Sequence, residues 1–125
     1  MILFRRVFVC FLLLLPVVSQ MTGETHAQQN GFTIEQLAGL YRVDGINPNG
    51  SKYSGEVNVV VRENIAYFAW SIAGRAYTGQ GGIQGNQLVI DWGSSAPVIY
   101  NVDQSGNLIG TWNNGQASER LTRLR

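Results

Sequence analysis

Turn signals that recur at short intervals constrain this chain more than any other feature. Clusters rich in Gly, Asn and Ser lie at 47–51, 63–64, 73–74, 84–86, 93–95, 104–107 and 113–115. Most successive clusters are about ten residues apart, a spacing typical of an all-β sandwich or barrel. The clusters therefore predict eight short strands, at about 40–46, 53–62, 65–72, 75–83, 88–92, 97–103, 108–112 and 116–124.

The segments between the turns show the alternation that strands require. In 53–62 one face carries Tyr53, Val57, Val59 and Val61, and the other carries Ser54, Glu56, Asn58 and Arg62, as in a strand with one solvated face. The segment 65–73 is apolar on both faces, so we expect it to be buried on both sides or covered by the N-terminal helix. Tight turns at nearly every junction favour a meander, and closing the meander removes its exposed edges. We therefore predict a small eight-stranded antiparallel up-and-down barrel. A capping-box pattern at Thr33 and Gln36 adds a short N-terminal helix.

The first 27 residues have the layout of a secretory signal peptide. Arg5 and Arg6 precede an apolar run over 7–18, and Ala27 ends a polar stretch at a plausible cleavage site. The apolar run is shorter than the ~20 residues that a spanning helix needs. The predicted organisation is a signal peptide at 1–27 and a single β-barrel domain at 28–125. We expect an exported protein, periplasmic or extracellular, with no stable membrane span after cleavage.

The composition after cleavage excludes several kinds of chemistry. Cys10 and His26, the only cysteine and histidine, lie in the leader, so we expect no cofactor, no metal site and no thiol or imidazole catalysis. The leader also holds Arg5, Arg6 and Glu24, which leaves seven basic and seven acidic residues and argues against a nucleic-acid partner.

A carboxylate pair is the leading enzymatic option that remains. Asp44 and Asp91 are its candidates because each falls within a predicted strand, although both also fit solvated strand positions. Spacing alone does not bring two carboxyl groups together. We therefore expect a non-catalytic binding protein, monomeric or weakly dimeric.

Aromatic residues are the best candidates for contacting a partner or ligand. Ten of them follow the leader, and the predicted contact residues are Tyr53, Trp70, Trp92, Tyr100 and Trp112. The leading interpretation is a protein-binding module that uses an exposed strand face and the loops 47–53 and 93–97, and it predicts a filled interior with an exposed Tyr or Trp patch. An open interior lined by Trp70, Trp92, Trp112 and Tyr100 would indicate a small-ligand calyx of avidin or lipocalin type. Packing in the core is the simplest alternative for all of them.

Several short motifs resemble those of a family of small exported bacterial β-proteins often labelled fibronectin-binding. The matching stretches are GLYRVDG (39–45), NPNGS (47–51), YSG (53–55), DWG (91–93) and GTW (110–112). This resemblance implies an extracytoplasmic module that binds a protein of the host matrix or the cell envelope. The stretch GTWNNGQAS is also similar to the first strand and loop of avidin-like barrels, although it comes last here. Periplasmic lysozyme inhibitors are similar in architecture alone.

Overall fold

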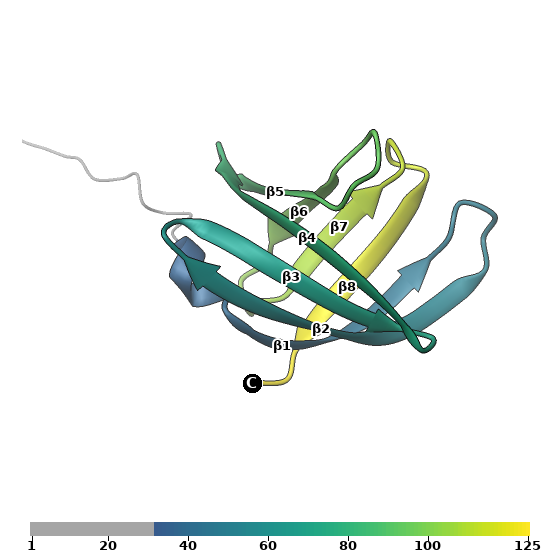
Figure 1. Cartoon of the computed structure of the whole chain (residues 1–125), viewed down its shortest axis with the longest axis horizontal. Helices are drawn as coiled ribbons and strands as arrows, with labels where there is room; N and C mark the ends of the chain where they lie inside the picture. Colours follow the sequence, from purple (N-terminus) through teal and green to yellow (C-terminus); the bar gives the residue numbers. More distant parts are fainter. Residues whose placement is uncertain (1–31) are drawn as a thin grey trace, which may run out of the picture. The chain divides into compact units, whose positions relative to one another are not determined.

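The computed structural model describes residues 32–125, so the predicted signal peptide lies outside the described residues. These residues form a closed barrel of eight antiparallel strands in sequential order (Figure 1), which confirms the predicted fold class. A short 3-10 helix precedes the strands. The elements are η2 (Ile34–Leu37), β1 (Gly39–Ile46), β2 (Lys52–Arg62), β3 (Ile65–Ile72), β4 (Arg75–Gln84), β5 (Gln87–Asp91), β6 (Val98–Val102), β7 (Leu108–Trp112) and β8 (Ala117–Arg123).

The barrel closes through the pairing of its first and last strands. In the β1–β8 ladder, Tyr41 lies opposite Arg123 and Gly45 lies opposite Glu119. Three backbone hydrogen bonds extend the closure past the end of β8. The Leu40 N–H donates to the Arg125 carbonyl at 2.7 Å, and the Leu40 carbonyl accepts from Leu124 N–H at 2.8 Å and from Arg125 N–H at 3.3 Å. Every strand thus has two partners, and no edge of the sheet is open.

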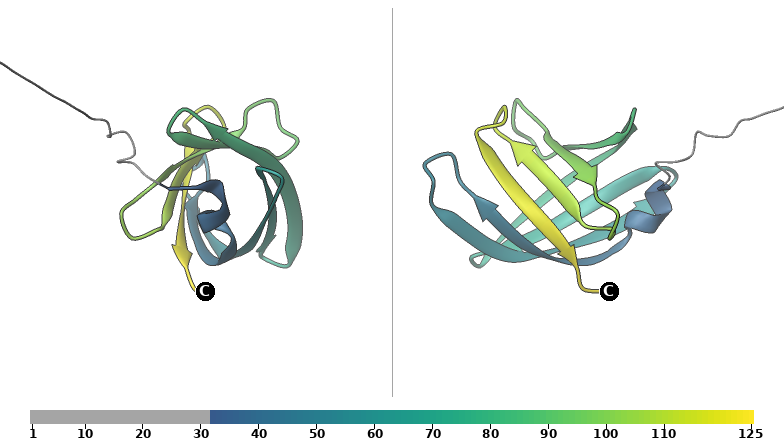
Figure 2. Two further views of the ribbon diagram at one scale, coloured as in Figure 1. Left: turned by 90° about the vertical axis from the view of Figure 1, so that its left-hand side faces the viewer. Right: turned by 180° about the vertical axis from the view of Figure 1, so that it is seen from behind.

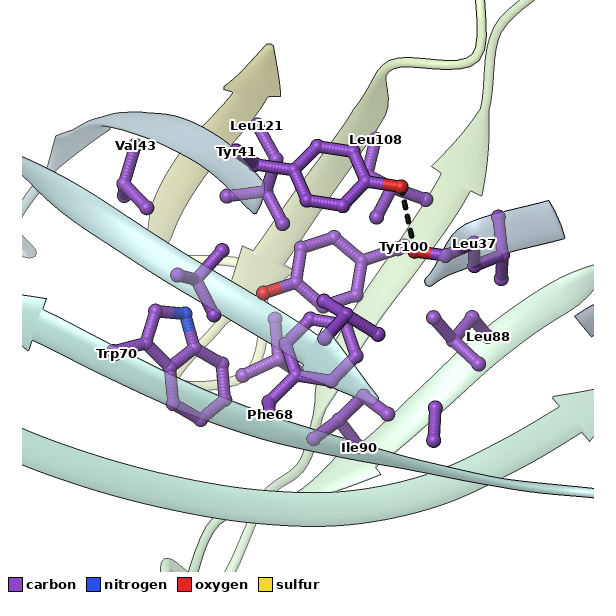
Figure 3. Packing of buried hydrophobic residues seen from close by; sticks show 14 of the residues in the cluster. Leu37, Tyr41, Val43, Phe68, Trp70, Leu88, Ile90, Tyr100, Leu108 and Leu121 are labelled. Atoms are coloured by element: carbon purple, nitrogen blue, oxygen red, sulfur yellow. Dashed lines mark hydrogen bonds between the residues drawn. The ribbon is translucent and has the colours of Figure 1, made fainter. Parts of the chain in front are cut away.

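One half of the barrel interior is packed with large apolar side chains. Tyr41, Leu88, Tyr100, Leu108 and Leu121 are fully buried. The Phe68 and Tyr100 rings stack with centroids 5.5 Å apart. Figure 3 shows this packing, with the Tyr100 hydroxyl directed toward the side of the core where Trp70 lies. Burial of this apolar surface supplies the main drive to fold.

Helix η2 lies across the end of the barrel next to this core (Figure 2, left). Its Leu37 is buried, and the Leu37 carbonyl accepts a hydrogen bond of 2.7 Å from the Tyr41 hydroxyl. Arg123 holds the helix from outside, because its guanidinium donates to the Ala38 carbonyl at 3.0 Å and to the Gln36 carbonyl at 2.6 Å. The same guanidinium lies over the Tyr41 ring. One end of the barrel is therefore closed.

The opposite end carries the β1–β2, β3–β4, β5–β6 and β7–β8 connections (Figure 1), because an up-and-down meander places alternate connections at the same end. The expectation that 65–73 is buried on both sides is wrong, although η2 does contact β3. Ala69 is exposed on the outer face of β3, and Tyr67 is only partly covered there, with the Arg62 guanidinium 4.6 Å from its ring centroid. A barrel of this size buries the inner face of each strand. A single tyrosine or alanine on the outer face can remain exposed to solvent and does not require another layer of structure to cover it.

Candidate functional site

An aromatic pocket occupies the end of the barrel opposite η2. It has a volume of about 280 Å³, and all three tryptophans of the chain line it. The connections β1–β2 and β3–β4 contribute Asn47 and Ala73 to its rim. We call this cavity the aromatic pocket; its lining residues are Asn47, Tyr53, Trp70, Ile72, Ala73, Arg75, Tyr77, Trp92, Val98, Trp112 and Glu119.

Four rings form a continuous chain of edge-to-face contacts around the aromatic pocket. The centroid distances are 6.5 Å from Tyr77 to Trp92, 5.6 Å from Trp92 to Trp112 and 6.3 Å from Trp112 to Tyr53. The Trp92 indole N–H donates to the Ala96 carbonyl at 3.2 Å, which ties the β5–β6 connection to the wall. Edge-to-face packing is the arrangement that aromatic quadrupoles favour. The wall is thus organised by its own contacts.

A buried carboxylate, Glu119, lies at the base of the aromatic pocket. Its side chain is 6% exposed and accepts three hydrogen bonds from neutral donors. Oε2 accepts from the Tyr100 hydroxyl at 2.5 Å and from the Trp70 indole N–H at 3.2 Å. Oε1 accepts from the Tyr53 hydroxyl at 2.7 Å, and that hydroxyl accepts in turn from the Trp112 indole N–H at 3.0 Å. The carboxylate therefore links the core to the pocket wall.

Glycines on both neighbouring strands make room for the two tyrosines that reach Glu119. Gly45 on β1 and Gly110 on β7 are the cross-strand partners of Glu119. A Cβ at position 45 would overlap the Tyr53 ring, and one at position 110 would lie 2.5 Å from Tyr100 Cδ1. Because neither position carries a Cβ, both rings approach the strand backbone closely and bring their hydroxyls to the carboxylate. This close approach gives the two glycines a packing role.

At the base of the aromatic pocket, the acidic side chain of Glu119 is surrounded by neutral hydrogen-bond donors. Within residues 32–125 the ion pairs are Arg42–Asp44 and Arg120–Asp103, and neither includes Glu119. Burial, followed by the charge and hydrogen bond of Glu119, raises the pKa of both Tyr53 and Tyr100 well above the ordinary tyrosine value. Both phenols therefore remain protonated and donate to the carboxylate at neutral pH.

The structure brings four of the five predicted contact residues into the aromatic pocket. Tyr53, Trp70, Trp92 and Trp112 line it. The prediction that Tyr100 lines an open interior is wrong, because Tyr100 is fully buried beneath the base and reaches Glu119 from the core side. The sequence predicted correctly that Tyr100 faces the barrel interior, but it did not predict how far along the barrel axis the side chain lies.

Sequence reasoning missed Glu119, and it did not single out Tyr77 or Arg75. The signal for Glu119 was present, since it shares the inward face of 117–123 with Ala117 and Leu121. An acid at an inward position of a small barrel is unusual, because charged side chains are rarely buried without partners. An acidic residue at an inward-facing strand position is therefore a signal in the sequence for a candidate functional site.

The carboxylate pair considered from the sequence does not converge. Asp44 on β1 and Asp91 on β5 are both exposed on the outer face of the barrel. Asp44 pairs with Arg42 at 3.1 Å, and Asp91 accepts from the Gly93 backbone N–H at 2.9 Å. In the part of the chain that the structure describes, no three acidic, His or Cys side chains gather closely enough to hold a metal ion. No helix within residues 32–125 is long and apolar enough to cross a membrane.

Comparisons with known proteins bear on the fold alone. No protein-family model matches this chain, and no curated protein matches it significantly in sequence. Among solved structures, a protein described as a redesigned beta barrel is similar to it, with a TM-score of 0.53 and 19% sequence identity. The similarity covers 72% of this chain and 93% of that chain. At this identity the likeness supports the barrel class and says nothing of a ligand.

Proposed function

We propose that this protein binds a small molecule in the aromatic pocket without catalysing a reaction on it. The observation that carries the proposal is the pocket itself, a cavity of about 280 Å³ at one end of a barrel whose other end is packed. Ligand sites in proteins are concave, mostly apolar and equipped with a few convergent polar groups. Five aromatic side chains around one carboxylate fit that description.

The size of the aromatic pocket sets the scale of the ligand. A cavity of about 150 Å³ with apolar walls holds benzene, so about 280 Å³ has room for one ring with a short substituent. Glu119 is the one acid among the lining residues. Glycoside hydrolysis requires two carboxyl groups across the bond to be broken. The lining therefore favours binding over that reaction.

A matched pair of substitutions tests whether ligands enter this pocket. Ile72 on β3 lines the pocket, whereas Ile83 on β4 is exposed and is not a lining residue. We expect isothermal titration calorimetry to detect binding of at least one single-ring compound from a panel of cationic, neutral and anionic members. Ile72→Trp should fill the pocket and abolish that binding, and Ile83→Trp should preserve it. Binding that survives Ile72→Trp would place the ligand elsewhere.

A second candidate function is recognition of a protein, as the resemblance to fibronectin-binding proteins implies. The observation in its favour is that the two stretches suggested from the sequence, 47–53 and 93–97, overlap the β1–β2 and β5–β6 connections, and Asn47 and Tyr53 of the first stretch line the aromatic pocket. A partner could insert one side chain between them. Calorimetry with fibronectin separates the candidates, because saturable binding of fibronectin together with silence from the whole small-molecule panel would favour this second function.

A further inference from the structure

We propose that the ligand of the aromatic pocket is a small organic cation that carries N–H donors, such as a primary ammonium, with its head directed to Glu119 Oε1. This inference rests on the proposed function and names the chemical class of its ligand. Three features of the described residues carry it: the charge balance of the base, the unused acceptor position of Glu119 and the aromatic wall.

Among residues 32–125, no positive side chain forms an ion pair with Glu119 at the base of the aromatic pocket. Glu119 accepts hydrogen bonds at both oxygens, which is the pattern of an ionised carboxylate. All three donors are neutral, and no ion pair between described residues includes Glu119. Buried charges in proteins are normally paired with an opposite charge or bound to a metal. A cationic ligand would supply the missing charge at the base.

The hydrogen bonds of Glu119 leave an acceptor position on one oxygen. A carboxylate offers about four lone-pair sites. Oε2 accepts two hydrogen bonds, from Tyr100 and Trp70, whereas Oε1 accepts one, from Tyr53. Each oxygen accepts from one lining residue, Oε1 from Tyr53 and Oε2 from Trp70, but Oε2 also accepts from the buried Tyr100, so Oε1 keeps the larger acceptor capacity. An N–H donor on the ligand fits that position, and an anionic ligand would meet repulsion from the carboxylate.

The aromatic wall suits a cation as well. Tyr53, Tyr77, Trp92 and Trp112 form the continuous chain of rings around the pocket. Ring faces attract cations through their quadrupoles, most strongly at tryptophan and in sites shielded from water. Arg75 lies at the rim and is exposed, so its charge is solvated and screened. The favourable place for a positive head is therefore the base of the pocket.

Three compounds of nearly equal size test the inference on the unmodified protein. Benzylamine is a cation at neutral pH, benzyl alcohol is neutral and benzoate is an anion. Calorimetry should show benzylamine binding about tenfold or more tightly than benzyl alcohol, with benzoate the weakest. Benzyltrimethylammonium, which keeps the charge and lacks N–H donors, should bind more weakly than benzylamine. Tighter binding of the quaternary ion would overturn the assignment of Oε1 as the acceptor.

A matched pair of variants locates the charge that the cation recognises. Glu119→Gln keeps the shape of the side chain and removes its charge, and we expect benzylamine and benzyl alcohol then to bind within about twofold of each other. Glu56→Gln makes the same charge change on the outer face of β2, where the residue is exposed, and should leave the tenfold preference intact. Thermal unfolding by circular dichroism establishes that each variant is folded. If Glu119→Gln is not folded, the comparison of the three compounds on the unmodified protein decides whether the ligand is a cation.

The outcomes separate the inference from the function on which it rests. Equal affinity for benzylamine and benzyl alcohol in the unmodified protein would overturn the cation and leave the small-molecule function standing. Binding of benzoate alone would also overturn it. Silence from every compound in the panel would overturn both proposals together.

Discussion

Replacing Tyr100 by phenylalanine tests whether Glu119 is an integral part of the core. The substitution removes one hydroxyl and leaves the ring that stacks on Phe68 in place. Tyr100 is fully buried and donates to a charged group. Because water has no access to replace that donor, we expect a loss of about 1.5–3 kcal/mol in the free energy of unfolding.

Tyr53→Phe is the matched control for this change. Its hydroxyl donates to the same carboxylate at 2.7 Å but lies in the wall of an open pocket, where water can take its place. We therefore expect a smaller loss, about 0.5–1.5 kcal/mol. Urea unfolding followed by far-ultraviolet circular dichroism measures both losses without relying on the tryptophans. In thermal unfolding, the melting temperature should fall by about 6–24 °C for Tyr100→Phe, given about 4–8 °C per kcal/mol for a domain of this size. A Tyr100→Phe variant no less stable than Tyr53→Phe would refute the reasoning.

Three further predictions concern pH, packing and the closed end of the barrel. The pKa values of the tyrosines that donate to Glu119 are raised, so the unfolded chain loses phenolic protons first. Stability should therefore be constant from pH 8 to about pH 10 and fall above it, as urea midpoints from pH 8 to 11 would show. Gly45→Ala should displace the Tyr53 ring, cost about 1–3 kcal/mol in calorimetric stability and weaken ligand binding, whereas Gly82→Ala, with a nearest contact of 3.3 Å, should cost less. Arg123→Met removes the donors to η2 and should lower stability by about 1–2 kcal/mol, with faster amide hydrogen exchange around η2; unchanged exchange would contradict the role assigned to this guanidinium.

Local sequence patterns were sufficient to predict the strands and their order. Alternation identifies which residues of β2, such as Val57 and Val59, face inward, because successive side chains of a strand point to opposite faces. Regular turn clusters then give eight strands in a meander, and closure follows from the cost of open edges. These are short-range properties of the chain.

The site depends on register, which alternation does not encode. Trp70, Trp92 and Trp112 come from separate strands, or from the residue just after one, and meet because the barrel staggers those strands. The same stagger places Tyr100 below the pocket. Glu119 escaped notice for a different reason, since a lone acid in a strand is normally solvated and its three donors are distant in sequence, the farthest being Tyr53.

The central claim is that the open end of the barrel is a binding site built by the tryptophans and Glu119. Nuclear magnetic resonance of the indole N–H groups tests it most directly, because all three tryptophans of the chain line the pocket and each gives one signal. Titration with benzylamine should shift all three signals along a single saturable curve, and benzyl alcohol should shift them with lower affinity. Indole signals that do not move at saturating benzylamine, or shifts confined to backbone amides of the outer face, would contradict the account.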